Sequence, residues 1–160
     1  MQQFDLIIIG GGPGGYLCAE RAGKAGLRTA LLEKRALGGT CLNEGCIPTK
    51  SLLYCAKQYQ TMLHCEEYGI AAQNVSYDHA AAVVRKDGIV QTLVRGVGIS
   101  MKKHGVAVFS TEGKITGKTG DLFTVSAGAE SLFAPRLVLA SGSSAVVPPI
   151  PGVRDGLASG

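Results

Sequence analysis

The sequence lacks tryptophan and any hydrophobic run long enough to cross a membrane. Aromatic residues together make up 6% of its 160 residues. No apolar stretch reaches the roughly 20 residues that span a bilayer. The opening MQQFDLIIIGGG has neither a basic start nor a signal-like cleavage site, so we do not expect a signal peptide. We therefore expect no membrane association and, by default, a cytoplasmic location.

The chain also lacks dense clusters of like charge. Its formal net charge is +4, and its lysines and arginines are scattered rather than grouped. A nucleic-acid-binding surface needs a concentrated basic patch, commonly with aromatic residues that stack on bases. We therefore expect no nucleic-acid partner. The length suits one domain, and the 46% hydrophobic and 18% charged content disfavours disorder.

The number of cysteines is odd, and there are few histidines. Five cysteines in 160 residues do not suit the dense, even-numbered disulfide frameworks of small secreted domains. Structural zinc sites take four ligands, commonly as two close pairs. The three histidines are scattered, so we expect His64 and His79 on the surface, His104 at a helix end, and no metal site.

What is present begins with a strand–helix–strand pattern. The run FDLIIIG (4–10) is apolar and β-branched, as buried strands of parallel sheets are. Residues 13–26 predict a helix, and LRTALLEK (27–34) predicts a second strand. This succession is a βαβ unit.

A loop and two long helices are predicted next. Residues 38–50 form the loop, and a helix runs from Pro48 to about Tyr68. Its apolar stripe is Leu52, Ala56, Tyr59 and Leu63. A second helix covers 78–103, with Asp78 as N-cap. Its apolar face is Val83, Val90, Leu93, Val97 and Met101, although Gly88, Gly96 and Gly98 each cost about 1 kcal/mol relative to alanine.

The last third of the sequence predicts mainly strands. GVAVFS (105–110) and LVLASGSS (137–144) are strands of the core sheet. Between them, short alternating runs broken by Gly, Asp and Pro predict a small antiparallel meander. A proline-rich connector follows, and no internal repeat is visible.

The turn between the first strand and the first helix carries a nucleotide-binding pattern. Gly10, Gly12 and Gly15 have the G-x-G-x-x-G spacing, which allows a tight turn, close approach of a pyrophosphate, and close helix–strand packing. The helix N-terminus attracts phosphate. Glu33, at the end of the second strand, suits a ribose and disfavours the 2′-phosphate of NADP. This pattern does not separate FAD from NAD.

Cys41 and Cys46 form the second notable pattern, in GGTCLNEGCIPTK (38–50). Zinc is disfavoured because the sequence offers no second pair of ligands near these cysteines. A structural disulfide is disfavoured because closing so short a loop adds little stability. Two unrelated buried thiols would not suit a loop rich in glycine and polar residues. A redox couple fits better, because Pro48 can start a helix whose dipole favours a thiolate at Cys46. Cys41 is then free to meet a substrate, and Lys50 lies one turn beyond Cys46.

The other three cysteines have no such setting. We expect Cys18, Cys55 and Cys65 to be small buried apolar residues in helices.

Several segments together resemble the pyridine nucleotide-disulfide oxidoreductases. They are GGGPGGY, LEK, LGGTCLNEGCIPTKSLL, EGKITG and LVLASGS. The details of the cysteine loop are most similar to those of family members that oxidise dihydrolipoamide. The loop is less decisive between these members and the glutathione and mercuric reductases, so a segment of such a reductase is an alternative. The resemblance implies an α/β fold: a Rossmann-like FAD-binding domain (1–150) with a parallel sheet and a small antiparallel β-meander insert. Residues 151–160 would then connect to an NAD-binding domain.

The resemblance also implies roles for individual residues. Cofactor contacts are implied for Gly10, Gly12, Gly14 and Gly15 at the pyrophosphate, Glu33 at the adenosine ribose, Thr40 beside the phosphates, Lys50 near flavin N5, Gly113 at the adenine, and Ser141, Gly142 and Ser143 closing over the cofactor. Lys34 is a further cofactor-binding residue by this resemblance. Cys41 would be the interchange thiol and Cys46 the charge-transfer thiol. Ser141 replaces the threonine usual in the family and keeps its hydroxyl.

The implied enzyme passes electrons from dihydrolipoamide through the cysteine pair and FAD to NAD⁺. Its partners would be the lipoyl domain of an acyl-dehydrogenase or glycine-cleavage complex and a second copy in a homodimer. Family members are much longer, and the His–Glu pair that serves their thiols is absent from this chain. We therefore expect an N-terminal FAD-binding segment, inactive by itself. The alternative from another class is a non-catalytic nucleotide-binding module with a structural cysteine pair.

Overall fold

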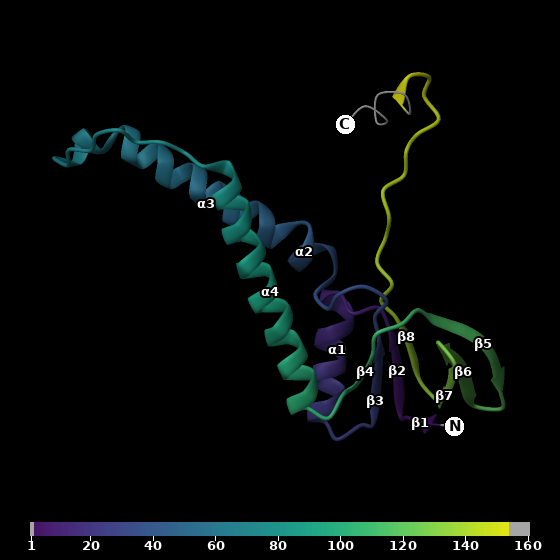
Figure 1. Cartoon of the computed structure of the whole chain (residues 1–160). Helices are drawn as coiled ribbons and strands as arrows, with labels where there is room; N and C mark the ends of the chain where they lie inside the picture. Colours follow the sequence, from purple (N-terminus) through teal and green to yellow (C-terminus); the bar gives the residue numbers. More distant parts are fainter. Residues whose placement is uncertain (1, 154–160) are drawn as a thin grey trace.

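The structure, a computed structural model that describes residues 2–153, has three layers and a helical arm (Figure 1). A parallel sheet forms the central layer. Helix α1 (Pro13–Lys24) and the C-terminal end of α4 (His79–Lys103) cover one face, and a second sheet covers the other. Helix α3 (Cys46–Leu63) and the rest of α4 form the arm, which extends away from the layers.

The parallel sheet contains the four core strands predicted from the sequence. They are β2 (Leu6–Ile9), β3 (Thr29–Leu32), β4 (Ala107–Phe109) and β8 (Leu137–Leu139), in the order β4-β3-β2-β8. The predicted α/β class is therefore confirmed. Because β3 and β8 lie on opposite sides of β2, the strand order reverses at β2. Ligands of open α/β sheets bind at the carboxyl ends of the strands at such a reversal.

Both faces of the parallel sheet are buried. Ile8 and Leu31 pack beneath the helices, whereas Ile7 and Leu32 pack against Leu132 of the second sheet. All five side chains are at most 1% exposed. Two apolar faces explain why β2 and β3 lack the apolar–polar alternation of a sheet with one wet face.

The second sheet is the predicted antiparallel meander with one added strand. Strands β5 (Gly113–Thr119), β6 (Leu122–Ala127) and β7 (Glu130–Ala134) pair in succession. Strand β1 (Gln2–Gln3) pairs in parallel with β7. It was not predicted, because two polar residues carry no strand pattern.

The loop predicted over 38–50 is wrong, because most of it is helical. Helix α2 (Gly39–Asn43) occupies its centre, and α3 begins at Cys46 rather than at Pro48. Five residues are too few to show helical periodicity, so the sequence pattern could not indicate α2. Helix α3 ends at Leu63, and a 3₁₀ helix, η1 (Cys65–Tyr68), follows where the longer helix was expected.

Helix α4 matches its prediction closely. The Asp78 carboxylate accepts a hydrogen bond from the backbone N–H of Ala81 at 3.0 Å, as an N-cap does. His104 is the C-cap, and His64 and His79 are exposed, as expected.

Burial along the two arm helices was only partly predicted. Leu52 and Tyr59 of α3 are half-buried, but Ala56 and Leu63 are exposed. On α4, Leu93 is exposed, whereas the other four residues of its predicted face are buried or half-buried. Helices α3 and α4 pack against each other, and this contact covers only a narrow stripe of each.

The three unpaired cysteines also depart in part from the prediction. Cys65 is buried in η1, but Cys18 and Cys55 are only half-buried. Cys18 packs against the core cluster beneath the helices, and Cys55 lies beside the Arg85 guanidinium on the arm.

The chain leaves the sheet after β8 in an extended segment. Residues 140–150 have no regular secondary structure, and Figure 1 shows this segment leading away from the layers. Most of the predicted connector 151–160 lies outside the described residues, so its boundary stays a prediction. Among residues 2–153, no helix has both the length and the apolar character needed to span a bilayer.

Candidate functional site

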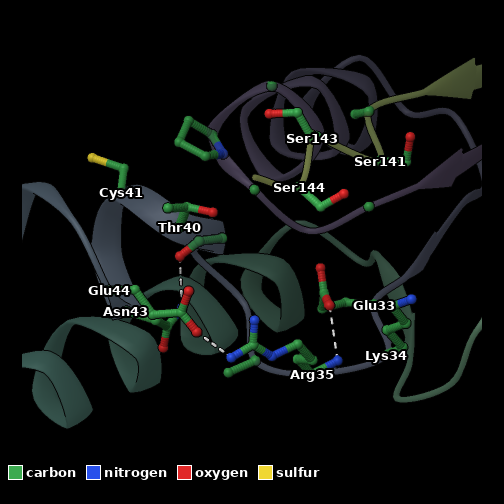
Figure 2. Close-up of a pocket in the computed structure, with 18 residues that line it drawn as sticks. Glu33, Lys34, Arg35, Thr40, Cys41, Asn43, Glu44, Ser141, Ser143 and Ser144 are labelled. Atoms are coloured by element: carbon green, nitrogen blue, oxygen red, sulfur yellow. Dashed lines mark hydrogen bonds and ion pairs between the residues drawn. The ribbon is translucent and has the colours of Figure 1, made fainter. Parts of the chain in front are cut away.

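A cavity of about 830 Å³ lies at the carboxyl ends of β2, β3 and β8. Its walls come from the glycine turn after β2, the segment after β3, helix α2, and the residues that follow β8 (Figure 2). Ten of the residues predicted for the site line it: Gly10, Gly12, Gly14, Glu33, Lys34, Thr40, Cys41, Ser141, Gly142 and Ser143. The tertiary structure therefore brings together segments separated by more than a hundred residues.

The glycine turn permits contacts that no side chain would allow. Gly10 has φ +106°, and a Cβ there would lie 2.1 Å from the carbonyl oxygen of Ala140. A Cβ on Gly15 would lie 1.7 Å from the carbonyl oxygen of Gly10. The first glycine thus makes the turn against β8, and the third lets α1 pack onto the strand, as the spacing predicts.

A second pair of glycines, not singled out from the sequence, joins this turn to α2. A Cβ on Gly39, whose φ is +58°, would lie 2.7 Å from the Cα of Gly12. The backbone N–H of Gly38 donates to the carbonyl oxygen of Gly11 at 2.8 Å. The signal was the doubled glycine before Thr40, which the loop prediction did not use.

The start of α1 faces the cavity with its backbone donors uncapped. Gly12 is the N-cap and Pro13 the first helical residue, and both line the cavity. No side chain caps this end, and its first turn contains no acidic residue. Free N–H groups and the positive end of a helix dipole favour an anion such as phosphate.

Glu33 lies beside this turn at the end of β3. Its Oε2 accepts a hydrogen bond from the backbone N–H of Gly11 at 2.7 Å, and its Oε1 accepts from that of Arg35 at 2.8 Å. Each carboxylate oxygen has a further lone pair, so the oriented carboxylate can still accept from a hydroxyl group in the cavity.

Charged side chains form two ion pairs at the rim. Arg35 pairs with Glu44 of the α2 end, and Lys34 pairs with Glu112 at 3.3 Å. Only Lys34 of these four was predicted for the site. The cavity lining that the sequence reasoning missed comprises Pro13, Arg35, Ala36, Gly39, Asn43, Glu44, Ala140 and Ser144.

Cys41 and Cys46 are joined in a disulfide, with their Cα atoms 4.6 Å apart. Cys41 lies in α2 and lines the cavity, whereas Cys46 is the first residue of α3 and is exposed. Cys46 was expected just ahead of the helix. Its place within the first turn still exposes the sulfur to the positive end of the helix dipole.

The remaining predicted residues do not line the cavity. Lys50 is exposed one turn beyond Cys46, and Gly15 packs behind the turn. Gly113 begins β5 and faces the side chains of Ile9 and Leu32. Their cofactor roles stay predictions. Within residues 2–153, no three His, Cys, Asp or Glu side chains gather in a group that could hold a metal ion.

Comparison with known proteins finds a matching family and relatives that share one enzyme name. The family described as pyridine nucleotide-disulphide oxidoreductase matches residues 4–160. Dihydrolipoyl dehydrogenase of Acholeplasma laidlawii is 43% identical over 160 residues, which cover 99% of this chain and 46% of the relative. The enzyme of the same name from Pseudomonas aeruginosa is 44% identical over 150 residues, which cover 91% of this chain and 32% of the relative.

A solved structure shares the fold. It is the Cu(II) complex of RclA from Escherichia coli, described as an HOCl-induced flavoprotein disulfide reductase. The TM-score is 0.73 at 27% sequence identity, and the match covers 94% of this chain and 30% of RclA. The chain therefore spans between about a third and a half of the length of the relatives it matches.

Proposed function

The chain belongs to the pyridine nucleotide-disulphide oxidoreductases, and we propose that it supplies the FAD site and the redox disulfide of an enzyme that oxidises dihydrolipoamide. The observation that carries this proposal is the Cys41–Cys46 disulfide at the edge of a glycine-walled cavity. The identities of 43% and 44% to dihydrolipoyl dehydrogenases support the choice of substrate. The lipoyl group would be presented by a partner domain, and a second copy of the protein would complete the site.

The residues of the cavity fit FAD. The uncapped start of α1 with Gly12 and Gly14 suits a pyrophosphate, and the Glu33 carboxylate suits a ribose hydroxyl. Thr40 and Ser143 line the cavity and can donate hydroxyl hydrogen bonds. When bound, FAD supplies a two-electron acceptor for the reduced cysteine pair and a hydride donor to NAD⁺.

The disulfide reacts by thiol–disulfide exchange. A substrate thiolate attacks the sulfur of Cys41, forming a mixed disulfide, and the Cys41–Cys46 bond breaks with its electron pair on Cys46. Cys46 is the better leaving group because it lies in the first turn of α3, where the helix dipole stabilises a thiolate. The second substrate thiol then attacks the mixed disulfide and releases cyclic lipoamide. Two substrate thiols are oxidised, and one protein disulfide becomes two thiols.

Trapping a mixed disulfide tests this assignment. A Cys46→Ser chain leaves Cys41 as a free thiol that can open oxidised lipoamide, and we expect a lipoamide adduct on Cys41 by peptide mass spectrometry. The half-buried thiols Cys18 and Cys55 serve as internal references. An adduct on Cys41 no faster than on these references contradicts the proposed function. Faster trapping on Cys46 in the matched Cys41→Ser chain reverses the two roles.

Flavin absorbance separates the proposal from its alternatives. We expect the chain to take up FAD and to show a long-wavelength thiolate–flavin band on two-electron reduction, a band lost in Cys46→Ser and enhanced in Cys41→Ser. Lys50→Met should keep FAD binding but slow flavin reduction. A chain that binds a nucleotide without such a band is the non-catalytic module. Adduct formation with glutathione disulfide in preference to lipoamide indicates the glutathione-reductase branch.

A further inference from the structure

Arg35 and Glu44 connect the segment after β3 to the loop that carries the disulfide. The Arg35 guanidinium donates to the Glu44 carboxylate, and both residues line the cavity (Figure 2). Glu44 is the C-cap of α2 and lies between the two bonded cysteines in the chain. The ion pair therefore ties the disulfide loop (residues 41–46) to the end of β3.

The same arginine is tied to the glycine turn. Its backbone N–H donates to Glu33 Oε1 at 2.8 Å, and Glu33 Oε2 accepts from the backbone N–H of Gly11 at 2.7 Å. Figure 2 shows Glu33, Arg35 and Glu44 in succession along one side of the cavity. A connected series of contacts thus runs from the glycine turn to the disulfide loop.

We propose that Arg35 and Glu44 are a positioning pair that holds the disulfide loop and sets how readily the disulfide is reduced. The inference rests on the redox function proposed above. In the oxidised chain the disulfide already orders the loop, so the ion pair forms at little further cost in conformational entropy. In the reduced chain the same ion pair must order a freer loop. The ion pair therefore stabilises the oxidised chain more than the reduced chain, and so it opposes reduction of the disulfide.

The expected effect is modest, because the two side chains are 71% and 48% exposed. An ion pair of this exposure changes an equilibrium constant by about two- to fivefold. For a two-electron couple that is a shift of roughly 9–21 mV, at 29.6 mV per tenfold change. Such a shift is measurable against a redox buffer.

A double-mutant cycle tests the pair. The purified chain is equilibrated in dithiothreitol redox buffers, and the reduced fraction of Cys41 and Cys46 is measured by alkylation and mass spectrometry. We expect Glu44→Gln to raise the reduction equilibrium constant two- to fivefold in the wild-type background and by less than half that factor in an Arg35→Gln background. Equal shifts in the two backgrounds overturn the proposal.

Two controls keep the result specific. Glu112→Gln breaks the similarly exposed Lys34–Glu112 ion pair, whose two residues follow β3 and precede β5 and lie outside the disulfide loop, so we expect no shift. Arg35→Lys keeps the charge and should stay within twofold of the wild type. A shift as large for either control as for Glu44→Gln overturns the proposal. This experiment uses dithiothreitol and not dihydrolipoamide, so its result does not depend on the proposed substrate. If the chain fails to trap lipoamide but Glu44→Gln and Arg35→Gln are coupled, the proposed substrate is wrong and the positioning pair stands.

Discussion

The glycines of the β2–α1 turn and those of helix α4 show how differently one residue type can be used. A Cβ on Gly10 or Gly15 would overlap a backbone carbonyl oxygen, whereas a Cβ on Gly88, Gly96 or Gly98 would meet nothing within 4 Å. The turn needs glycine because strand, helix and β8 meet there. The arm tolerates glycine because those positions face away from its packing. Glycine is therefore required by close backbone contacts in the turn, whereas no such contact requires it in α4.

The largest expected effect comes from Gly15→Ala. Its methyl group would lie 1.7 Å from the Gly10 carbonyl oxygen, so α1 must move off the sheet. We expect a loss of more than about 3 kcal/mol in the free energy of unfolding, or no folding at all, together with loss of the FAD binding proposed above. Urea unfolding followed by circular dichroism measures it. Near-normal stability of Gly15→Ala would show that α1 and the Gly10 carbonyl oxygen are farther apart than described.

A core substitution should destabilise the layers far more than the arm. Leu31 is 0% exposed, so Leu31→Ala should cost about 2–4 kcal/mol by leaving a cavity. The matched change Leu53→Ala, on an arm residue that is 63% exposed, should change stability by less than about 0.5 kcal/mol. Urea midpoints compare the two. Equal losses would mean that the exposed arm face is covered in solution.

Gly96→Ala should act in the opposite direction from Gly15→Ala. Alanine has space at this position and is the better helix former, so the chain should gain up to about 1 kcal/mol. Thermal unfolding of the two variants side by side gives the measurement. Destabilisation by Gly96→Ala would reveal a contact of α4 beyond those described.

The smallest effect concerns the junction between the layers and the arm. Lys24, and then the hydroxyl of Ser100 on α4, donate to Glu20 and hold its pKa below the usual value. Since the folded-state pKa is lowered, this contribution is present above the unfolded-state pKa and is lost as pH falls through the folded-state pKa. In Glu20→Gln the free energy of unfolding should therefore fall slightly less steeply than in the wild type as the pH drops below about 4. Urea unfolding at a series of pH values measures it. An unchanged acid profile would contradict the assignment.

Strong local patterns made much of the fold predictable. The apolar strands, the α1 turn glycines and the Asp78 cap each depend on neighbouring residues, and the structure has them where expected. Helix α2 was missed because five residues show no period. Exposure of Leu93 was missed because helical periodicity identifies an apolar stripe but not how much of it a neighbour covers.

The candidate site divides in the same way. Gly10, Glu33 and the cysteine spacing were evident in the sequence because each belongs to a short motif with its own chemistry. The Gly12–Gly39 approach and the Arg35–Glu44 pair were not, because each joins segments whose contact depends on the folded chain.

The sequence alone determined the succession of the four core strands and the three long helices along the chain, the glycine turn and the two cysteines five positions apart, since these follow from local chain geometry. Only the tertiary structure decided that residues after β2, β3 and β8 enclose one cavity and that α2 carries Cys41 to its edge. The physical reason is that the order of strands across a sheet arises from burying two apolar faces at once, which no local pattern encodes.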